Sequence, residues 1–221
     1  MRMRRKPWAR PELAQCPYYI KDASACKGKW RSLFDCGDRP LYVEFGCGKC
    51  GFAIKHALEY PEINLLAFDI KSEMLAVGRR KAELAFEEAQ RRPDNLRLVS
   101  HNISAVETAF DSTDAVDRIY INFCNPWPRG KHQKRRLTYP LLLKKYAAFL
   151  KPEGEIRFKT DDDELFEDSL KYFAESGYKL TYVTHDLHAS DFEGNIMTEH
   201  EEMFSSEGIK IKMLIAGRAN P

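Results

Sequence analysis

Short apolar runs alternate with longer helical segments over most of this chain, and this alternation constrains the fold more than any other feature. The apolar runs are rich in branched aliphatic and aromatic residues, as strands are. We expect strands at residues 41–45, 63–68, 96–99, 116–123, 155–159, 178–184 and 209–215. Strands that alternate with helices form a mostly parallel, doubly wound sheet. The sequence therefore predicts an α/β, Rossmann-like fold with a seven-stranded sheet.

The segments between these runs carry apolar residues at helical spacing. We expect helices at residues 52–60, 72–92, 138–150 and 163–175. Pro93 stops the second helix, and Pro140 stands in the first turn of the third, where proline is well tolerated. The last two strands are instead separated by residues 185–207, which show little helical pattern and are interpreted as a loop. A closing strand that runs antiparallel to the others suits this end of the chain.

Residues 1–38 show no clean periodicity and mix prolines with basic and aromatic side chains. We interpret them as a basic, irregular N-terminal arm with at most a short helix, followed by one α/β domain over 39–221. No apolar run is long enough to cross a membrane, and the basic N-terminus lacks the apolar stretch of a secretory signal. We expect a cytoplasmic protein that does not bind membranes. Both a monomer and a homodimer are compatible with the sequence.

The formal net charge is only +2, but its distribution is uneven. Basic residues crowd two stretches that contain no acidic residue, namely Arg2, Arg4, Arg5, Lys6 and Arg10, and then Arg129, Lys131, His132, Lys134, Arg135 and Arg136. Local basic clusters in a nearly neutral chain are typical of surfaces that bind polyanions such as nucleic acids. Charge by itself favours solvated, flexible segments, so the nucleic-acid interpretation needs support from neighbouring motifs.

A glycine-rich turn follows the first expected strand and opens a helix: Gly46-Cys47-Gly48-Lys49-Cys50-Gly51. It matches the G-x-G-x-x-G pattern, and Asp69 ends the next strand, so the pattern alone also fits an NAD site. The turn holds the one C-x-x-C pair among the six cysteines, and no second pair at zinc spacing follows. We therefore expect reduced, mostly buried thiols and no metal site.

Glu44 stands two residues before the first glycine, at the end of its strand. In a dinucleotide site a carboxylate here would repel the pyrophosphate, whereas it would attract the sulfonium and ammonium groups of S-adenosylmethionine. We therefore predict an S-adenosylmethionine site, in which Gly46 and Gly48 let the backbone approach the ligand and Asp69 accepts the ribose hydroxyls. Asn102, after the third strand, is a candidate for binding the adenine, although asparagine is also a favoured helix cap.

The fourth expected strand ends at the switch point of the sheet and runs into Asn125-Pro126-Trp127-Pro128. The two prolines make a rigid turn that can present Asn125 to a substrate, and the basic run from Arg129 follows at once. Phosphate-binding charges next to a substrate turn indicate a nucleic-acid site. Trp127 is either a platform on which a base stacks or a packed aromatic residue.

These motifs resemble those of the bacterial tRNA (guanine-N7-)-methyltransferases. The matching segments, in the family's order and spacing, begin at Val43 (VEFGCGKCGF), Phe68 (FDI), Ile121 (INFCNPWPRGKHQKRRL), Phe158 (FKTDD) and Thr198 (TEHEEMFSSEG). The NPWP-basic and TExE segments are specific to the family, and the glycine turn is not. The resemblance implies the S-adenosylmethionine methyltransferase variant of the fold, and methylation at N7 of guanosine 46 in the tRNA variable loop.

Carried over segment by segment, the resemblance assigns Glu44, Asp69 and Asn102 to the cofactor and places Asn125 between cofactor and substrate. The candidate substrate contacts are Arg129, Lys131, His132, Arg135, Arg136, Asp161, Thr198, Glu199 and Glu201. Guanine N7 carries a free lone pair, so its methylation needs little help from a general base. A carboxylate is still useful, because the product base is positively charged. Asn125 and Asp161 are therefore the candidate catalytic residues.

Two positions depart from the residues that are usual in the family. Cys50 stands where glycine is usual, and Asn125 stands where the family has an aspartate that is treated as catalytic. Asn125-Pro126-Trp127-Pro128 also resembles the Asn-Pro-Pro-aromatic motif of enzymes that methylate exocyclic amines. Another nucleic-acid base methyltransferase and a non-catalytic RNA-binding relative therefore remain as alternatives.

Overall fold

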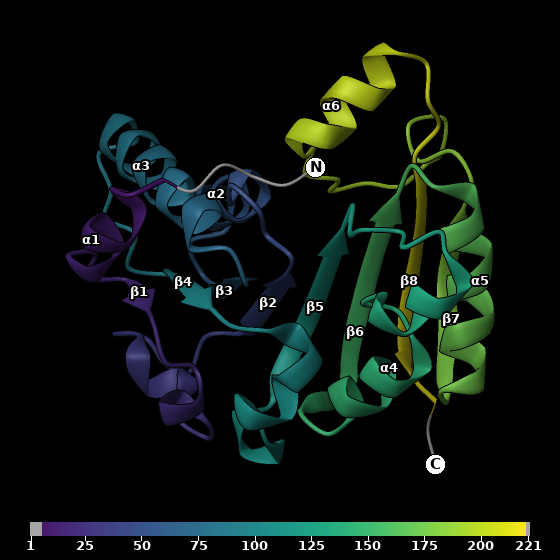
Figure 1. Ribbon diagram of the computed structural model, residues 1–221, viewed down its shortest axis with the longest axis horizontal. Coiled ribbons are helices and arrows are strands. Elements are labelled where there is room, and N and C mark those ends of the chain that lie inside the picture. Colours follow the sequence, from purple (N-terminus) through teal and green to yellow (C-terminus); the bar gives the residue numbers. More distant parts are fainter. Residues whose placement is uncertain (1–5, 220–221) are drawn as a thin grey trace.

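The computed structural model describes residues 6–219 and has one eight-stranded sheet in the order β1-β4-β3-β2-β5-β6-β8-β7 (Figure 1). Strands β1 to β6 pair in parallel, and β8 runs antiparallel to both β6 and β7. The strands are β1 Tyr19–Ile20, β2 Leu41–Phe45, β3 Asn64–Asp69, β4 Leu96–Ser100, β5 Val116–Asn122, β6 Leu150–Thr160, β7 Tyr178–Thr184 and β8 Lys212–Arg218. The predicted α/β class and the antiparallel closing strand are confirmed, with one more strand than expected.

Two hydrophobic cores cover the two faces of the sheet, because side chains alternate between the faces along each strand. Leu66 and Phe68 of β3 join the core that contains α4 and α5, whereas Leu65 and Ala67 join the core that contains α1, α2 and α3. The α-helices are α1 Ala9–Ala14, α2 Gly51–Glu59, α3 Ser72–Glu88, α4 Pro140–Ala147, α5 Asp163–Glu175 and α6 Glu199–Ser206. The 3-10 helices are η1 Ser24–Cys26, η2 Trp30–Leu33, η3 Ile103–Thr108, η4 Ser112–Asp114 and η5 Gly130–Arg135.

The N-terminal segment is more ordered than the irregular arm that we expected. Residues 6–38 contain α1, η1 and η2 as well as β1, which adds a strand to the sheet by pairing with β4. Trp30 is fully buried in the main core, and its indole Nε1 donates to the carbonyl of Ala109 at 2.8 Å. The short helix that this expectation allowed is present as α1, whereas β1, η1 and η2 were not expected. Residues 1–5, with Arg2, Arg4 and Arg5 of the first basic cluster, lie outside the described residues.

The segment between the last two strands contains a helix that we did not predict. Within the expected loop at 185–207, α6 begins after Thr198 and ends before Gly208, and β8 starts at Lys212, later than expected. Figure 1 shows α6 beyond the arrowheads of β5 and β6, at the edge of the sheet where parallel strands end. This edge is where ligands bind in doubly wound sheets. Among the described residues, no helix is long and apolar enough to span a membrane.

Candidate active site at the carboxyl ends of the parallel strands

The glycine-rich turn joins β2 to α2 through residues with left-handed backbone angles. Gly46 has φ 82°, Gly48 has φ 55° and Cys50, the residue that caps α2, has φ 61°. The amides of Gly46 and Cys47 both donate to the carbonyl of Phe68 at 2.9 Å, which ties the turn to the end of β3. Positive φ is easy for glycine but strained for cysteine. This strain explains why glycine is usual at position 50 in the family that the sequence resembles.

Cys50 is accommodated because α3 offers a glycine opposite its side chain. A Cβ added to Gly78 would meet the Cys50 Sγ at 2.5 Å and the Lys49 carbonyl oxygen at 3.1 Å. The Cys50 Sγ lies 3.6 Å from that of Cys47, so the two thiols are in contact without a disulfide. Burial raises the pKa of Cys47 well above its usual value. Both thiols therefore pack as small apolar groups beneath the turn.

We expect Gly78→Ala to destabilise the protein by about 1–3 kcal/mol, the range for an overpacked core. Helix propensity alone would stabilise it by about 1 kcal/mol, so the sign of the change shows whether Cys50 occupies this space. The measurement is urea denaturation of the variant against the native chain. The double variant Cys50→Gly/Gly78→Ala should recover only part of the loss, because the Lys49 carbonyl remains close. A Gly78→Ala protein as stable as the native chain would contradict this packing.

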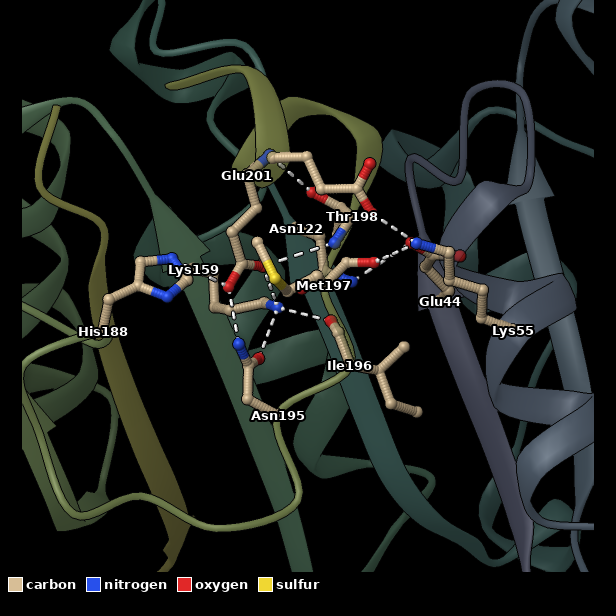
Figure 2. Close-up of polar contacts among 11 residues, drawn as sticks. Glu44, Lys55, Asn122, Lys159, His188, Asn195, Ile196, Met197, Thr198 and Glu201 are labelled. Atoms are coloured by element: carbon tan, nitrogen blue, oxygen red, sulfur yellow. Dashed lines mark hydrogen bonds and ion pairs between the residues drawn. The ribbon is translucent and has the colours of Figure 1, made fainter. Parts of the chain in front are cut away.

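Glu44 lies beneath this turn in an open pocket, which Gly46, Gly48 and Asn122 also line. Its side chain is 3% exposed, and the Asn122 Nδ2 donates to its Oε1 at 3.1 Å (Figure 2). The other oxygen, Oε2, has no hydrogen-bond partner among residues 6–219. Burial raises the pKa of Glu44 to about 7, and the Asn122 hydrogen bond and the charge of Lys159 oppose that rise. An unpaired buried acceptor of this kind suits a cationic or hydrogen-bond-donating ligand.

Asp69 and Asn102 lie near the same edge but do not line this pocket. Asp69 is half-buried, and its carboxylate accepts hydrogen bonds from the amides of Gly48 at 3.0 Å and Lys71 at 2.7 Å. Burial raises the pKa of Asp69, while those two backbone donors lower it. The exposed Asn102 caps η3, accepting from the Ser104 amide at 3.1 Å. Both residues thus have structural partners of their own.

The two candidate catalytic residues follow adjacent strands. Asn122 of β5 and Lys159 of β6 are register partners, so Asn125 and Asp161 leave the sheet at the same edge. Asn125 is exposed, and its Oδ1 accepts from the Trp127 amide at 3.0 Å, which closes the turn before Pro128. Asn125 therefore shapes the turn as well as facing solvent.

Asp161 differs from the two acidic residues that follow it. Asp162 caps α5 by accepting from the Leu165 amide at 2.7 Å, and Asp163 pairs with Lys212 at 2.6 Å. The half-buried Asp161 carboxylate makes no hydrogen bond or ion pair with any other described residue, whereas its backbone carbonyl accepts from the Lys212 Nζ at 2.8 Å. A carboxylate with a fixed backbone and no partner of its own is available to a ligand.

The second basic cluster lies on and around η5. Arg129, Lys131, Lys134 and Arg135 are exposed and His132 is half-buried. The Arg135 guanidinium lies 5.1 Å from the centre of the Trp127 ring, and the His132 ring meets that indole edge-on at 5.7 Å. This cluster therefore presents flexible cations around one aromatic ring.

Arg136 does not belong to this exposed surface. Its side chain is fully buried, and it donates to Asp168 at 2.6 Å, to Glu164 at 2.8 Å and to the carbonyl of Pro126 at 2.6 Å. Unlike the exposed cations of the cluster, Arg136 uses all three of its guanidinium nitrogens for contacts within the protein. Arg136 instead fixes the turn at Pro126 against α5.

The Thr198–Glu201 segment is the first turn of α6. The Thr198 Oγ1 accepts from the Glu201 amide at 3.0 Å and the Glu201 Oε2 accepts from the Thr198 amide at 3.4 Å, which is a capping box. Thr198 and Glu199 line the pocket beside Glu44, and the exposed Glu199 pairs with Lys81. Glu201 is fully buried, and its carboxylate is engaged by Lys159 inside the protein.

Asn122 and Lys159 were not predicted as site residues. Both lie on strands, next to positions that the motifs singled out, and both are buried polar residues at the edge of the site. A lysine inside an apolar strand run was the available signal, since a buried ammonium needs an acidic partner.

Comparison with known proteins identifies the family. A model for a protein family described as "Putative methyltransferase" matches residues 38–214. A tRNA (guanine-N(7)-)-methyltransferase of Clostridium beijerinckii is 54% identical over 220 residues, which cover 100% of both chains. A protein of the same name from Clostridium perfringens strain SM101 is 53% identical over 98% of this chain and 99% of its own. The chain therefore belongs to the family of tRNA (guanine-N(7)-)-methyltransferases.

The fold agrees with that membership. A crystal structure of the 16S rRNA methyltransferase KamB superposes with a TM-score of 0.61 at 18% identity, over 86% of this chain and 91% of that one. This chain is thus a methyltransferase, and both the resemblance and the Rossmann-like methyltransferase class inferred from the sequence are confirmed.

Proposed function

We propose that the protein transfers the methyl group of S-adenosylmethionine to N7 of guanosine 46 in the variable loop of tRNA, in the cytoplasm. The observation that carries this proposal is the buried Glu44 carboxylate, with one unpaired oxygen, in a pocket at the same sheet edge as the exposed cations of η5. The relatives named tRNA (guanine-N(7)-)-methyltransferase support the base and the atom. The position in the tRNA follows from the sequence resemblance.

The residues around the turn fit S-adenosylmethionine better than a dinucleotide. The ligand supplies an electrophilic methyl group on a sulfonium, and it also carries an ammonium, so Glu44 gains a positively charged partner for its unpaired oxygen. A pyrophosphate would face the same carboxylate and be repelled. Gly46 and Gly48 leave room for the ligand next to the backbone, and Asp69 retains lone pairs for ribose hydroxyls beyond its two amide bonds.

The protein's own contribution to the reaction is positioning and charge. Guanine N7 attacks through a free lone pair, so no side chain must remove a proton first. Correct orientation alone can supply roughly 7–11 kcal/mol of the barrier. The Asn125 turn and Trp127 would hold the base, and the unpartnered Asp161 carboxylate would stabilise the positive charge that develops on it.

Transfer of tritium-labelled methyl groups to unmodified tRNA tests this proposal directly. Nucleoside analysis of the product should show 7-methylguanosine, and a matched tRNA with adenosine in place of guanosine 46 should accept no label. Label on an exocyclic amine would support the alternative class of base methyltransferase. Label in the tRNA that lacks guanosine 46 would refute guanosine 46 as the methylated position. Absence of label from both tRNAs would support the alternative that the protein is a non-catalytic RNA-binding relative.

The exposed cations of η5 should set the salt dependence of tRNA binding. We expect Lys134→Ala/Arg135→Ala to weaken binding and to reduce the slope of log K against log salt by about 1–2, because each phosphate contact releases a counterion. Filter binding between low and physiological salt measures the slope, and affinity for S-adenosylmethionine should stay unchanged. Arg136→Ala is the contrasting variant, since it should lower stability by about 1–3 kcal/mol by leaving the Pro126 carbonyl and the half-buried Asp168 carboxylate without their donor. An unchanged slope in the double variant would remove η5 from the tRNA footprint.

A further inference from the structure

A buried ion pair joins β6 to the segment that carries α6. The Lys159 Nζ donates to the Glu201 Oε2 at 2.6 Å, to the Asn195 Oδ1 at 3.0 Å and to the carbonyl of Ile196 at 3.0 Å (Figure 2). The Lys159 side chain is 4% exposed and that of Glu201 is 0% exposed. The three protons of the ammonium are therefore all used inside the protein.

Glu201 connects Lys159 to the start of α6. Its Oε1 accepts from the Asn195 Nδ2 at 2.6 Å and lies 3.4 Å from the His188 Nε2, while its Oε2 also closes the capping box with Thr198. The Glu201 carboxylate thus contacts both the loop before α6 and the first turn of the helix. Without Lys159, this buried carboxylate would lose the cation that lies 2.6 Å from it.

The start of α6 forms one wall of the pocket that Glu44 lines. Thr198, Glu199 and His200 line that pocket from above, and the His200 ring stacks on Phe123 with centres 6.0 Å apart. The exposed contacts of α6, such as the ion pair between Lys55 and Glu202 at 2.6 Å, lie at the surface. Exposed pairs of this kind contribute about 0–1 kcal/mol, so the buried attachment through Lys159 has the greater part in placing the wall.

Lys159 is also adjacent to the residue that holds Glu44, although it does not itself line their pocket. Its register partner Asn122 is the residue that bonds Glu44, and the positive charge of Lys159 lowers the pKa of Glu44 while burial raises it. The remaining groups that shift the pKa of Glu44 are Asp69, which raises it, and the Ala53 backbone amide of α2, which lowers it. Lys159 is the cation that lowers the pKa of Glu44 most.

We propose that Lys159 is a positioning residue that fixes the α6 wall of the pocket through Glu201 and, with the same buried charge, favours the Glu44 carboxylate that receives the cationic cofactor. A buried ion pair adds little net stability compared with apolar residues of similar volume. The Lys159–Glu201 pair would instead have a positioning function, because it connects α6 to the strands that hold Glu44. The part that concerns the cofactor rests on the proposed function, and the part that concerns α6 does not.

Hydrogen exchange tests the attachment of α6 without any ligand. The variant Lys159→Met/Glu201→Gln removes both buried charges together. The glutamine oxygen can keep the capping box with the Thr198 amide, and its amide nitrogen can donate to the Asn195 Oδ1 that Lys159 releases. We expect the amides of 199–206 to exchange at least about tenfold faster than in the native chain. The rate of exchange depends on the free energy of local opening, and this free energy depends on the contacts that hold the segment in place. Lys55→Met is the matched control, since it releases only the exposed contacts of α6, and it should change that protection much less. Equal protection in the double variant and the native chain would overturn this part.

Calorimetric titration with S-adenosylmethionine between pH 6 and pH 9 tests the effect on Glu44. Affinity for the native chain should rise through about pH 7 as Glu44 ionises. In Lys159→Met/Glu201→Gln the midpoint of this rise in affinity should move up by about 1 pH unit or more, which is the usual effect of losing a neighbouring opposite charge. Lys55→Met should leave the midpoint unchanged. The ionisation of the ligand itself is the same for all three proteins.

A second variant keeps the result decisive if the double variant does not fold. Glu201→Gln alone leaves Lys159 buried without its anion, which favours the neutral amine, so the midpoint should move in the same direction. An unmoved midpoint in a variant that binds would overturn the proposal for Lys159. A native chain that does not bind S-adenosylmethionine would instead overturn the proposed function, and the hydrogen-exchange result would still stand.

Discussion

Asp161→Asn is expected to lower the rate of methyl transfer in a single turnover by about 10²–10³, the scale for losing one well-placed electrostatic group. The Asp161 carboxylate follows β6 at the edge of the site and has no partner among the described residues, so its charge is free to act on a ligand. Methylation of N7 leaves the guanine positively charged, and the amide of asparagine cannot oppose that charge. The measurement is a rapid-quench assay with saturating tRNA, which separates chemistry from binding.

Asp162→Asn is the matched control for this experiment. Asp162 is the neighbour that caps α5, and asparagine is an equally good cap. The control should therefore keep both its stability and its rate, although it changes the same charge one residue away. Comparable losses in the two variants would show that the effect is one of general charge and not of Asp161.

Asn125 should behave differently, because its role is to shape the turn. Asn125→Asp keeps an oxygen that can accept from the Trp127 amide, so it should retain substantial activity or raise it. Asn125→Ala loses that bond and should fall between the native rate and that of Asp161→Asn. If Asn125→Ala is inactive while Asp161→Asn is unaffected, the two roles have been assigned the wrong way round.

The regular part of the fold was predictable because its patterns are long and unbroken. The limits of β2, α5 and β7 agree with the expected ranges, since each combines a clear period with a glycine, proline or cap at its end. The two residues of β1 are too few to show a period, and pairing with β4 is what makes them a strand. The helix α6 has eight residues, and only its capping box marks it in the sequence.

The site was predictable where a motif fixes the backbone and not where packing decides which way a charge faces. Glu44 and the glycine turn form the pocket as a local pattern would suggest. Arg135 and Arg136 are neighbours in one basic run, yet the first is exposed and the second is fully buried between two acids of α5. Glu201 is likewise buried by Lys159, a partner 42 positions away. Such pairings arise from tertiary contacts, which a local run of charges does not encode.

Glu44→Gln should separate stability from function. We expect affinity for S-adenosylmethionine to fall by about 10- to 10²-fold, because a charge-assisted contact worth about 1.5–3 kcal/mol is lost at the unpaired oxygen. The fold should become more stable at the same time, since the native chain must ionise a buried carboxyl whose pKa is raised from 4.5 to about 7. Calorimetric titration measures the first effect and urea denaturation at several pH values measures the second.

The sign of the stability change follows from proton binding. Between pH 4.5 and about pH 7 the folded chain keeps a proton on Glu44 that the unfolded chain releases, so this group makes the native chain less stable as pH rises. Glutamine has no such dependence, and the gain in Glu44→Gln should grow from almost nothing below pH 4.5 to about 3 kcal/mol at pH 8. Glu199→Gln is the matched control, because this exposed carboxylate lines the same pocket but pairs with Lys81. It should lose far less affinity and gain no stability at pH 8, and a Glu44→Gln protein that binds as well as the native chain would exclude Glu44 from the cofactor site.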